Sequence, residues 1–340
     1  MKEVELIATA AAGVESAVKS EVIKLGYKDV VVENGKIMFK GDISSIPRAN
    51  LWLRSADRVL LKIGEFEALT FEELFNKTFA LPWDEWITRD GKFTVLGKSV
   101  KSKLFSISDS QAIVKKAVVE KLKSKYNVDW FEENGPEYTI QVSLHKDIAT
   151  LTIDTSGTAL HKRGYRAKNV EAPIKETLAS AMIMISYWNK SKPFLDCFCG
   201  SGTIPIEAAL IGRNIAPGLN RTFASEEWPV IGKDIWKQER VAALKAINQD
   251  INLKIYASDI NTDAIELAKE NAYLAGVDDC IEFVVSDFRD IRIKEDYGVI
   301  ICNPPYGERI SEQQEVEIIN RDMGKVFSRY DTWSKYIITS

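Results

Sequence analysis

The segment that most constrains the fold is Asp196–Thr203, which reads Asp-Cys-Phe-Cys-Gly-Ser-Gly-Thr and stands between an apolar segment and a helical one. Two glycines one residue apart allow a sharp turn and a close backbone approach to a ligand, and the helix that follows offers free N–H groups. A dinucleotide site needs a third glycine where this chain has Pro205, and a phosphate loop needs a Gly-Lys-Ser/Thr sequence that does not follow. What remains is another kind of ligand loop or a tight turn without function.

From residue 193 onward, short apolar segments alternate with helical ones. This alternation is typical of a parallel, doubly wound α/β sheet. A further helix is expected over 173–187, with Pro173 in its first turn, where a missing N–H removes no helical hydrogen bond. The predicted strands cover 193–198, 255–260, 281–286, 299–302 and 336–339, and the helices between them begin near Thr203, Trp236, Thr262 and Gln313.

The first 155 residues follow a different pattern, in which strands and helices mix with hairpins. Asn34-Gly35, the strongest short hairpin signal, separates two apolar segments, and Lys146-Asp147 separates two more. A helix capped by Asp109 or Ser110 is expected to run to about Tyr126. This is an α+β pattern. The polar, glycine-containing stretch 156–172 is predicted to be a linker.

Two further carboxylates stand at predicted strand ends in the second half. Asp259, followed by Ile260, could accept both ribose hydroxyls of a nucleoside, or it could cap the next helix. Asp287 could accept an adenine amino group while Phe288 flanks the base, or it could belong to a simple turn. Together with Asp196, these acids end three successive strands. Such ends meet in the crevice where doubly wound sheets bind ligands.

The fourth strand is followed by Asn303-Pro304-Pro305-Tyr306-Gly307-Glu308-Arg309. An exocyclic amine on a base is a poor nucleophile because its lone pair is delocalised into the ring, so two acceptors must hold its hydrogens out of conjugation. The Asn303 amide oxygen and the Pro304 carbonyl are candidate acceptors, in a loop that the two prolines stiffen. Tyr306 offers a face for a base taken out of its stack. The alternative, a Pro-Pro turn with a surface tyrosine, fits less well at a strand end opposite the glycine turn.

The net charge of −4 argues against a general nucleic-acid binder, but the basic residues are clustered. Between Lys98 and Lys125 there are eight lysines and two acids, and a second cluster covers His161–Lys168. Two local patches fit a directed RNA footprint, although Lys115–Lys125 alone could be a solvated helix face. The candidate RNA contacts are Lys98, Lys101, Lys103, Lys115, Lys116, Lys162, Arg163 and Arg166.

Several classes of protein are excluded by composition. The four cysteines, Cys197, Cys199, Cys280 and Cys302, are too few and too clustered for a disulfide framework. No apolar run reaches the length of a membrane span, and the acidic start is unlike a signal peptide. The two histidines are too isolated to suggest a metal site. We therefore expect a cytoplasmic protein, a monomer, with no membrane partner and no bound metal.

Together these motifs resemble those of the class I methyltransferases, over the whole chain. Leu160–Arg166, Ala172–Leu178 and Gly307-Glu308-Arg309 narrow the resemblance to the RlmL-type enzymes, which methylate guanine N2 in 23S rRNA and are often labelled N6-adenine-specific DNA methylases. The resemblance implies a ferredoxin-like segment over 1–55, a THUMP RNA-binding domain over 56–155, a linker over 156–172 and a Rossmann-like methyltransferase domain over 173–340.

The resemblance also implies S-adenosylmethionine as the methyl donor and ribosomal RNA as the partner. No metal is needed, because the sulfonium is itself the activated leaving group. Pro173 and its neighbours would line the methionine end of the donor. The other implied donor-binding residues are Asp196, Cys199, Gly200, Ser201, Gly202, Thr203, Asp259, Ile260, Asp287, Phe288 and Asn303, and the implied catalytic residues are Asn303, Pro304, Pro305 and Tyr306.

The chain departs from the family pattern in three places. Cys197 stands where the family usually has proline. The long stretch 211–251 separates the first two strands of the sheet, and it could contact substrate through Arg213, Arg221, Trp228 and Trp236. The family's sheet has seven strands, whereas the last strand expected here is the fifth, so either the terminal pair would be missing or the protein would have been shortened.

Three other functions remain open from the sequence. The target could be guanine N2 in tRNA, or adenine N6 in DNA or RNA, because the Asn-Pro-Pro-Tyr motif alone does not separate them. The chain could also be a non-catalytic RNA-binding module. The intact Asp196, Gly200, Gly202 and Asn303 argue against this last function.

Overall fold

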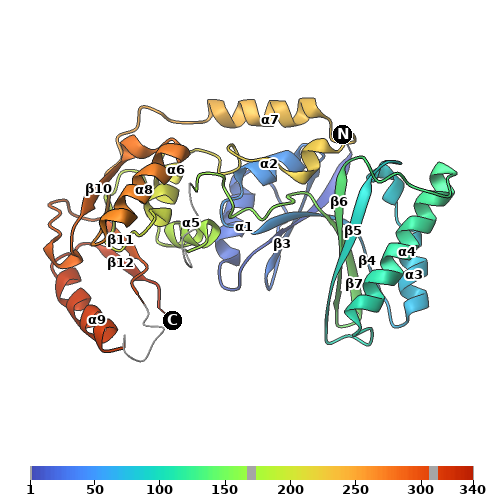
Figure 1. Cartoon of the computed structure of the whole chain (residues 1–340), viewed down its shortest axis with the longest axis horizontal. Helices are drawn as coiled ribbons and strands as arrows, with labels where there is room; N and C mark the ends of the chain where they lie inside the picture. Colours follow the sequence, from blue (N-terminus) through green and yellow to red (C-terminus); the bar gives the residue numbers. More distant parts are fainter. Residues whose placement is uncertain (1, 167–173, 306–312, 340) are drawn as a thin grey trace. The chain divides into compact units, whose positions relative to one another are not determined.

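The computed structural model describes residues 2–166, 174–305 and 313–339. The chain divides into two compact units (Figure 1). The first comprises Met1–Leu160 and Thr222–Ala242, and the second comprises His161–Arg221 and Ala243–Ser340. The first unit is α+β and the second is α/β with a parallel sheet, so the predicted fold class is confirmed.

The described part of the first unit is built on one seven-stranded sheet of order β2-β3-β1-β4-β7-β6-β5. Neighbouring strands are antiparallel except for β5 and β6, which are parallel. The sheet is continuous across position 55, because β4 pairs with both β1 and β7. Its strands are β1 (Glu3–Thr9), β2 (Val31–Glu33), β3 (Lys36–Asp42), β4 (Arg58–Glu67), β5 (Lys92–Val100), β6 (Glu137–His145) and β7 (Ile148–Asp154).

Two hairpins of this sheet follow from turn chemistry. Asn34-Gly35 joins β2 to β3, and Gly35 has the positive φ of +74° that such a turn requires. Lys146 and Asp147 join β6 to β7 and both adopt positive φ, at 51° and 65°. Both hairpins lie where the sequence predicts them.

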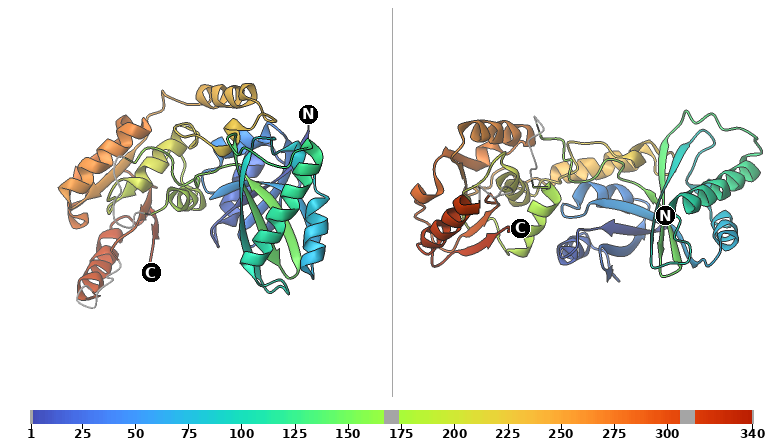
Figure 2. Two further views of the ribbon diagram at one scale, coloured as in Figure 1. Left: turned by 45° about the vertical axis from the view of Figure 1, so that its right-hand side comes forward. Right: turned by 60° about the horizontal axis from the view of Figure 1, so that its bottom comes forward.

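The helices of the first unit supply much of its core. Figures 1 and 2 show α3 and α4 side by side, and α4 also packs on β5. The predicted cap of α4 is wrong: the helix begins one turn earlier, and the Ser106 hydroxyl accepts the Asp109 N–H. Ser106 can cap because its backbone is extended, with ψ of 108°. The helices are α1 (Glu15–Lys24), α2 (Ser45–Trp52), α3 (Phe71–Phe79) and α4 (Ile107–Tyr126), with a 3₁₀ turn at Trp83–Glu85.

The stretch between the first two strands of the second unit returns to the first unit over Thr222–Ala242. Trp228 is 1% exposed, stacks on Tyr138 at 4.9 Å between ring centroids, and donates its indole N–H to the Glu137 carbonyl. Trp236 is also buried, and it stacks on Phe223. Neither indole can contact substrate, because both are enclosed in the apolar core of the first unit.

The two arginines of the same stretch also have partners within the protein. Arg213 pairs with Asp279 and donates to the Gly276 carbonyl. Arg221 donates to the Lys162 carbonyl. The four residues that were expected to contact substrate therefore contact other parts of the protein. The tryptophans do so in the core, and the arginines do so through hydrogen bonds.

In the second unit the described residues form five parallel strands in the order β10-β9-β8-β11-β12. The first strand of the unit, β8, is central. Successive strands go to one side as far as β10, and the chain then crosses to the other side with β11. The strands are β8 (Phe194–Asp196), β9 (Ile255–Asp259), β10 (Ile281–Val285), β11 (Val299–Cys302) and β12 (Ser334–Ile337).

Helices cover both faces of this sheet. The cluster that includes Ile204, Ala257 and Ile265 lies on the face covered by α6 and α8, and the cluster around Ile300 and Met323 lies on the face covered by α9. The helix predicted from Pro173 begins at Glu176, because Lys175 is extended and serves as its N-cap; Pro173 itself lies outside the described residues. The helices are α5 (Glu176–Ile185), α6 (Thr203–Gly212), α7 (Lys233–Lys245), which starts in the returning stretch, α8 (Thr262–Ala275) and α9 (Gln313–Phe327).

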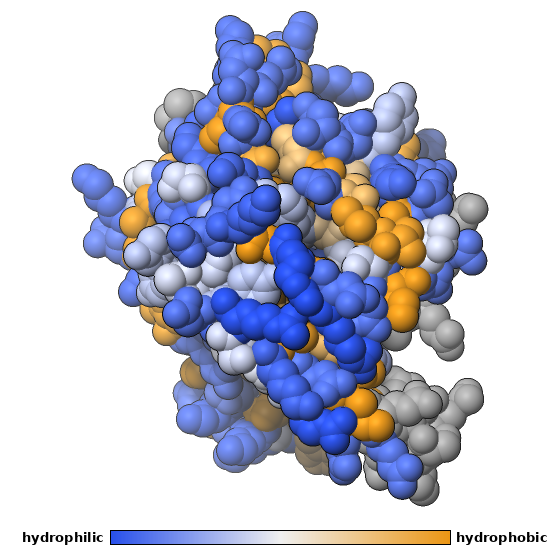
Figure 3. All heavy atoms as spheres, turned by 90° about the vertical axis from the view of Figure 1, so that its left-hand side faces the viewer, coloured by the Kyte–Doolittle hydropathy of each residue, from blue (hydrophilic) through white to orange (hydrophobic). Residues whose placement is uncertain are grey.

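Two segments of the predicted linker pack firmly. Leu160 is buried in the core of the first unit, and Arg163 and Tyr165 are buried in the second. Figure 3, which views the side of the molecule at the left of Figure 1, shows a mostly hydrophilic surface with scattered apolar residues. Across the described ranges, we find no helix with the length and hydropathy of a membrane span.

The burial of Trp228 predicts its contribution to stability. Trp228→Ala should lower the free energy of unfolding by about 3–5 kcal/mol, the usual cost of removing a large aromatic side chain from a core. Trp228→Phe should cost less, because the stack on Tyr138 remains. Urea denaturation followed by circular dichroism measures both. The exposed Trp130 provides the control, and equal losses for Trp228→Ala and Trp130→Ala would contradict the assignment.

Candidate functional site

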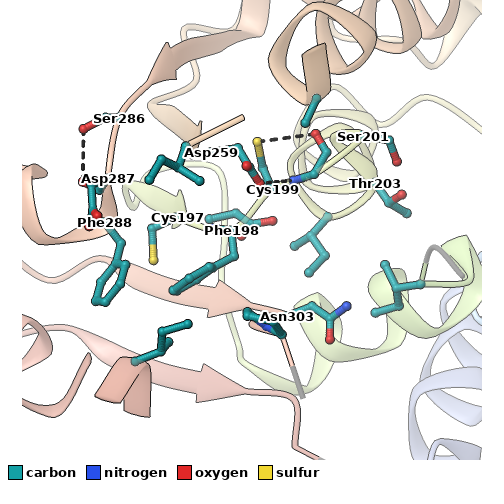
Figure 4. Close-up of a pocket in the computed structure, with 18 of the residues that line it drawn as sticks. Cys197, Phe198, Cys199, Ser201, Thr203, Asp259, Ser286, Asp287, Phe288 and Asn303 are labelled. Carbon is teal, nitrogen blue, oxygen red and sulfur yellow. Dashed lines mark hydrogen bonds between the residues drawn. The ribbon is translucent and has the colours of Figure 1, made fainter. Parts of the chain in front are cut away.

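The chain order of the parallel strands creates a crevice beside β8. Because β9 and β11 flank β8 on opposite sides, the connections that follow β8 and β11 leave the carboxyl ends of these strands in different directions. A pocket of about 500 Å³ lies there, within the range of roughly 300–1,000 Å³ of small-molecule sites. It is lined by residues from the ends of β8, β9, β10 and β11 (Figure 4).

The two glycines of the turn have different tasks. Both have positive φ, +51° at Gly200 and +83° at Gly202. A Cβ at Gly200 would meet nothing within 4 Å, so this position leaves open space at the pocket. A Cβ at Gly202 would come within 3.0 Å of the Ala268 Cβ on α8. Gly200 therefore permits ligand approach, whereas Gly202 permits close packing of the two helices.

Asp259 lies at the end of β9 and faces the glycine turn. Its Oδ2 accepts the Gly200 N–H at 2.9 Å, and its Oδ1 accepts the Asn261 N–H at 2.9 Å. The cap of α8 is Asn261, whose side chain accepts the N–H groups of Asp263 and Ala264. Asn261 therefore caps α8, which is the alternative role considered for Asp259. The Asp259 carboxylate retains further lone pairs toward the pocket.

Asp287, Phe288 and Ile260 also line the pocket. The Asp287 carboxylate caps the short turn after it by accepting the Arg289 N–H, and it pairs with the Arg289 guanidinium at 2.8 Å. The strand-end turn considered from the sequence is therefore present. Asp287 both caps this turn and lines the pocket. The Phe288 ring packs against Phe198 at 4.9 Å, and the two rings form an apolar side of the pocket (Figure 4).

Asp196, at the end of β8, is the buried acid of the site. Its Oδ1 accepts the Phe198 N–H, while its Oδ2 has no hydrogen-bond partner among the described residues. Desolvation by burial raises the pKa of Asp196 to about 8. An unpartnered, buried carboxyl oxygen is costly unless a ligand completes it. A cationic ligand would do so, and S-adenosylmethionine carries both an ammonium and a sulfonium.

The Asn-Pro-Pro segment lies on the opposite side of the crevice from the glycine turn. Asn303 and Pro305 line the pocket, whereas Pro304 is buried below it. Figure 4 shows the Asn303 side chain at the same hollow as Asp259 and Thr203. Tyr306, the last residue of this predicted set, lies outside the described residues. An amide beside a donor-sized pocket is suitably placed to orient an incoming amine.

Arg163 was expected to contact RNA, but it lies inside the second unit. It is 3% exposed and pairs with Glu207, which also accepts hydrogen bonds from Tyr165 and Ser180. The Lys162 side chain next to it is exposed. We therefore leave Arg163 out of the RNA footprint, because a guanidinium enclosed by protein cannot reach a phosphate.

Arg166, also expected to contact RNA, instead connects residues around the pocket. Its guanidinium pairs with Glu176 and donates to the Ile174 carbonyl and to the Thr203 hydroxyl, each at 3.1 Å. A longer contact of 3.5 Å joins it to the Ser201 hydroxyl. Sequence reasoning missed this role because Ser201 and Thr203 are 35 and 37 residues away in the chain, and because no local pattern shows that Glu176, ten residues away, is buried beside Arg166. The order of the basic residues in Leu160–Arg166 does not indicate which side chains point into the protein.

The other predicted RNA contacts lie on the surface. Lys98, Lys101, Lys103, Lys115 and Lys116 are all exposed, on β5, on the loop after it and on α4. Lys116 also lies over the Phe75 ring, 5.9 Å from its centroid. These lysines belong to the first unit, whereas Lys162 belongs to the second.

The cysteines near the turn are packing residues. Cys197, Cys199, Cys280 and Cys302 are buried and reduced. The contact with Cys302, together with burial, raises the pKa of the Cys197 thiol well above its usual value, so this thiol stays protonated. In the ranges that the structure describes, His, Cys, Asp and Glu do not gather in groups able to hold a metal ion.

Three family models match consecutive parts of the chain. Residues 5–60 match the RlmL ferredoxin-like domain, residues 68–154 match the THUMP domain, and residues 163–340 match the RMKL-like methyltransferase domain. Among curated proteins, "Putative RNA methyltransferase YpsC" of Bacillus subtilis is 53% identical over 343 residues, which cover 100% of this chain and 89% of that protein.

Solved structures resemble the whole chain. A protein of Listeria monocytogenes, described as a predicted N6-adenine-specific DNA methylase, is 51% identical with a TM-score of 0.97, covering 100% of this chain and 90% of that one. SMU.472, crystallised in complex with SAH, is 45% identical with a TM-score of 0.94 and the same coverage. TrmN from Thermus thermophilus, at 19% identity and a TM-score of 0.68, shares the fold.

The position of Asp259 predicts a loss of donor affinity in its alanine variant. Asp259→Ala should weaken S-adenosylmethionine binding by about 1–3 kcal/mol, the cost of leaving buried hydrogen-bonding groups unpaired. Titration calorimetry measures this change. Asp263→Ala, which removes an exposed acid at the start of α8, is the matched control. Equal affinity in Asp259→Ala and the native chain would remove Asp259 from the site.

The raised pKa of Asp196 predicts proton release on donor binding. Near pH 7 the carboxyl holds its proton, because its pKa of about 8 lies above that pH. A cationic donor favours the carboxylate, so binding should expel a proton and affinity should rise with pH up to about 8. Calorimetry in buffers of different ionisation enthalpy counts the protons. Asp196→Asn should release none, and identical proton release by the native chain and this variant would exclude the mechanism.

Proposed function

Because this chain belongs to the RMKL-like methyltransferase family, we propose that it methylates the exocyclic N2 amine of a guanine in 23S ribosomal RNA. It is an S-adenosylmethionine-dependent methyltransferase whose substrate is RNA. The observation that carries the proposal is the position of Asn303, which lines the donor pocket at the end of β11, across from the glycine turn at the end of β8.

The residues of the pocket divide between donor and target. The donor supplies a methyl group that its sulfonium has already activated. Asp259 and the Gly200 backbone lie where they can hold its ribose, and the Phe198 and Phe288 rings lie where its adenine can stack. Asp196 offers an anionic partner for its cationic end. Of these residues, Asp196, Gly200, Asp259 and Phe288 are proposed from the sequence, and Phe198 is added because it lines the same pocket.

Asn303 and the Pro304 carbonyl are proposed to prepare the target amine. Two acceptors that hold the two N–H groups turn the nitrogen lone pair out of conjugation with the base and toward the methyl group. The nitrogen then bonds to the methyl carbon as the carbon–sulfur bond breaks, and one of the amine protons leaves afterwards. The prolines limit the conformations of the loop, so that both acceptors are set before the base arrives. Pro305 borders the pocket, and Tyr306 is proposed from the sequence to stack on the extruded base.

Three observations favour RNA as the substrate class. Residues 68–154 match the THUMP domain, and exposed lysines cluster on that domain in a chain of net charge −4. The name of the Bacillus subtilis relative also points to RNA. Guanine N2 in tRNA and adenine N6 remain the alternative targets, which product analysis separates.

The proposed role of Asn303 predicts a specific kinetic defect. Asn303→Ala should lower the single-turnover rate of methyl transfer by about 10²–10³-fold, the scale for losing one preorganised polar contact at a reacting centre. Donor affinity, measured by calorimetry, should barely change. Purified 23S rRNA, bulk tRNA and DNA are each incubated with labelled donor. Nucleoside analysis then identifies the methylated product.

Two results of that assay would change the proposal. A native single-turnover rate in Asn303→Ala would remove the amine-orienting role. Recovery of N6-methyladenosine, or of N2-methylguanosine from tRNA alone, would keep the chemistry but replace the substrate.

A further inference from the structure

At one end of the sheet of the first unit, two loops form a basic tip, defined here as residues 100–105 together with Lys146 and Asp147. Residues 100–105 comprise the last residue of β5 and most of the connection to α4, and Lys146-Asp147 is the turn between β6 and β7. Because β5 and β6 are parallel, their carboxyl ends meet at the same edge. In Figure 1 this edge is the lower end of β5, β6 and β7.

Hydrogen bonds between the two loops hold the basic tip in one conformation. The Lys103 N–H donates to the Asp147 carboxylate at 2.6 Å, and the Asp147 N–H donates to the Ser102 hydroxyl at 3.0 Å. The Lys146 N–H donates to the Val100 carbonyl at 3.2 Å. Lys101 has a positive φ of 53°, and Lys146 and Asp147 have the positive φ values of a two-residue hairpin turn. The tip is therefore a preformed surface.

The basic tip presents an aromatic ring among cations. Phe105 is 82% exposed, although its neighbour Leu104 is buried. Lys101, Lys103 and Lys146 are exposed, and none of the three forms an ion pair within the described residues. The one carboxylate in the tip, Asp147, is occupied by the Lys103 backbone. Single exposed apolar side chains are common on protein surfaces, so what distinguishes this ring is its place among three exposed cations.

We propose that the basic tip binds an unpaired segment of the RNA substrate, with Phe105 stacking on one base and Lys101, Lys103 and Lys146 contacting the neighbouring phosphates. This inference rests on the proposed RNA substrate and names the part of it that the first unit recognises. A base has an apolar face for the ring and an anionic backbone for the lysines, and both must be within reach together. A duplex offers phosphates but keeps its bases stacked, so it cannot use the ring.

The chain contains a matched control for the ring. Trp130 is 83% exposed and follows the opposite end of α4, which is 20 residues, or roughly 30 Å, long. Its surroundings are acidic, with Asp129, Glu132 and Glu133 nearby in the chain. An RNA backbone should avoid this end. Two equally exposed aromatic residues on one domain therefore differ mainly in the charge around them.

The test measures binding of the full chain, without methyl donor, to fluorescein-labelled oligouridylate and to an RNA duplex of the same length by fluorescence anisotropy. Phe105→Ala should weaken oligouridylate binding by about 5- to 150-fold, the range for losing one base stack, and should leave the duplex affinity nearly unchanged. Phe105→Trp should restore binding, and Trp130→Ala should bind like the native chain. Replacing the three lysines by alanine should lower the salt dependence by about 0.7 in slope for each lost phosphate contact.

The outcomes separate this inference from the proposed function. Native oligouridylate affinity in Phe105→Ala, or equal losses in Phe105→Ala and Trp130→Ala, would overturn the stacking role even if the native chain methylates 23S rRNA. A loss confined to Phe105→Ala and reversed by Phe105→Trp would support it, even if no methylated RNA were found. Because Phe105 is exposed, its variants should keep the native melting temperature, and a loss of affinity that follows a lowered melting temperature would count against the inference.

Discussion

The pairing of β8 with β11 is the constraint on which the site depends. The two strands are parallel, with Phe194 opposite Val299 and Leu195 opposite Ile300, so both end at the same edge of the sheet. The glycine turn leaves one strand there, and the Asn-Pro segment leaves the other. The glycine turn and the Asn-Pro segment come together because the chain has crossed from β10 to the far side of β8. A sheet with the same strands in sequential order would separate them.

The glycine turn is held in place by contacts from several directions. The Cys199 N–H donates to the Ser258 carbonyl, and the Gly200 N–H donates to Asp259 on the same strand. The Asn271 side chain, on α8, donates to the Ser201 carbonyl. Arg166 reaches Thr203 from the other side. These contacts within the protein support the positive φ values of the turn, so the ordering of its backbone does not have to be taken entirely from the free energy of donor binding.

The core of the first unit is completed by residues from later in the sequence. Trp228 and Trp236 enter that core from a stretch inserted between β8 and β9, and Arg48 pairs with Glu239 of the same stretch. The stretch between β8 and β9 is therefore part of the scaffold of the first unit. The sheet spans the ferredoxin-like and THUMP matches without a break, so the two share one core rather than forming separate bodies.

The sequence by itself determined the alternation of strands and helices in the second half, the two hairpins of the first, and the set of residues at strand ends, because turn chemistry and hydrophobic periodicity are local. It also singled out Asp196, Asp259 and Asn303, since a strand end is recognisable within a few residues. Only the tertiary structure decided which charged residues face inward. Arg163 and Arg166 lie in one basic run with Lys162. Arg163 nevertheless pairs with Glu207, 44 residues away in the chain, and Arg166 pairs with the buried Glu176. The same holds for Trp228 and for the hydrogen bonds between the loop after β5 and the β6–β7 turn, because burial and long-range proximity depend on strand order, which no local pattern encodes.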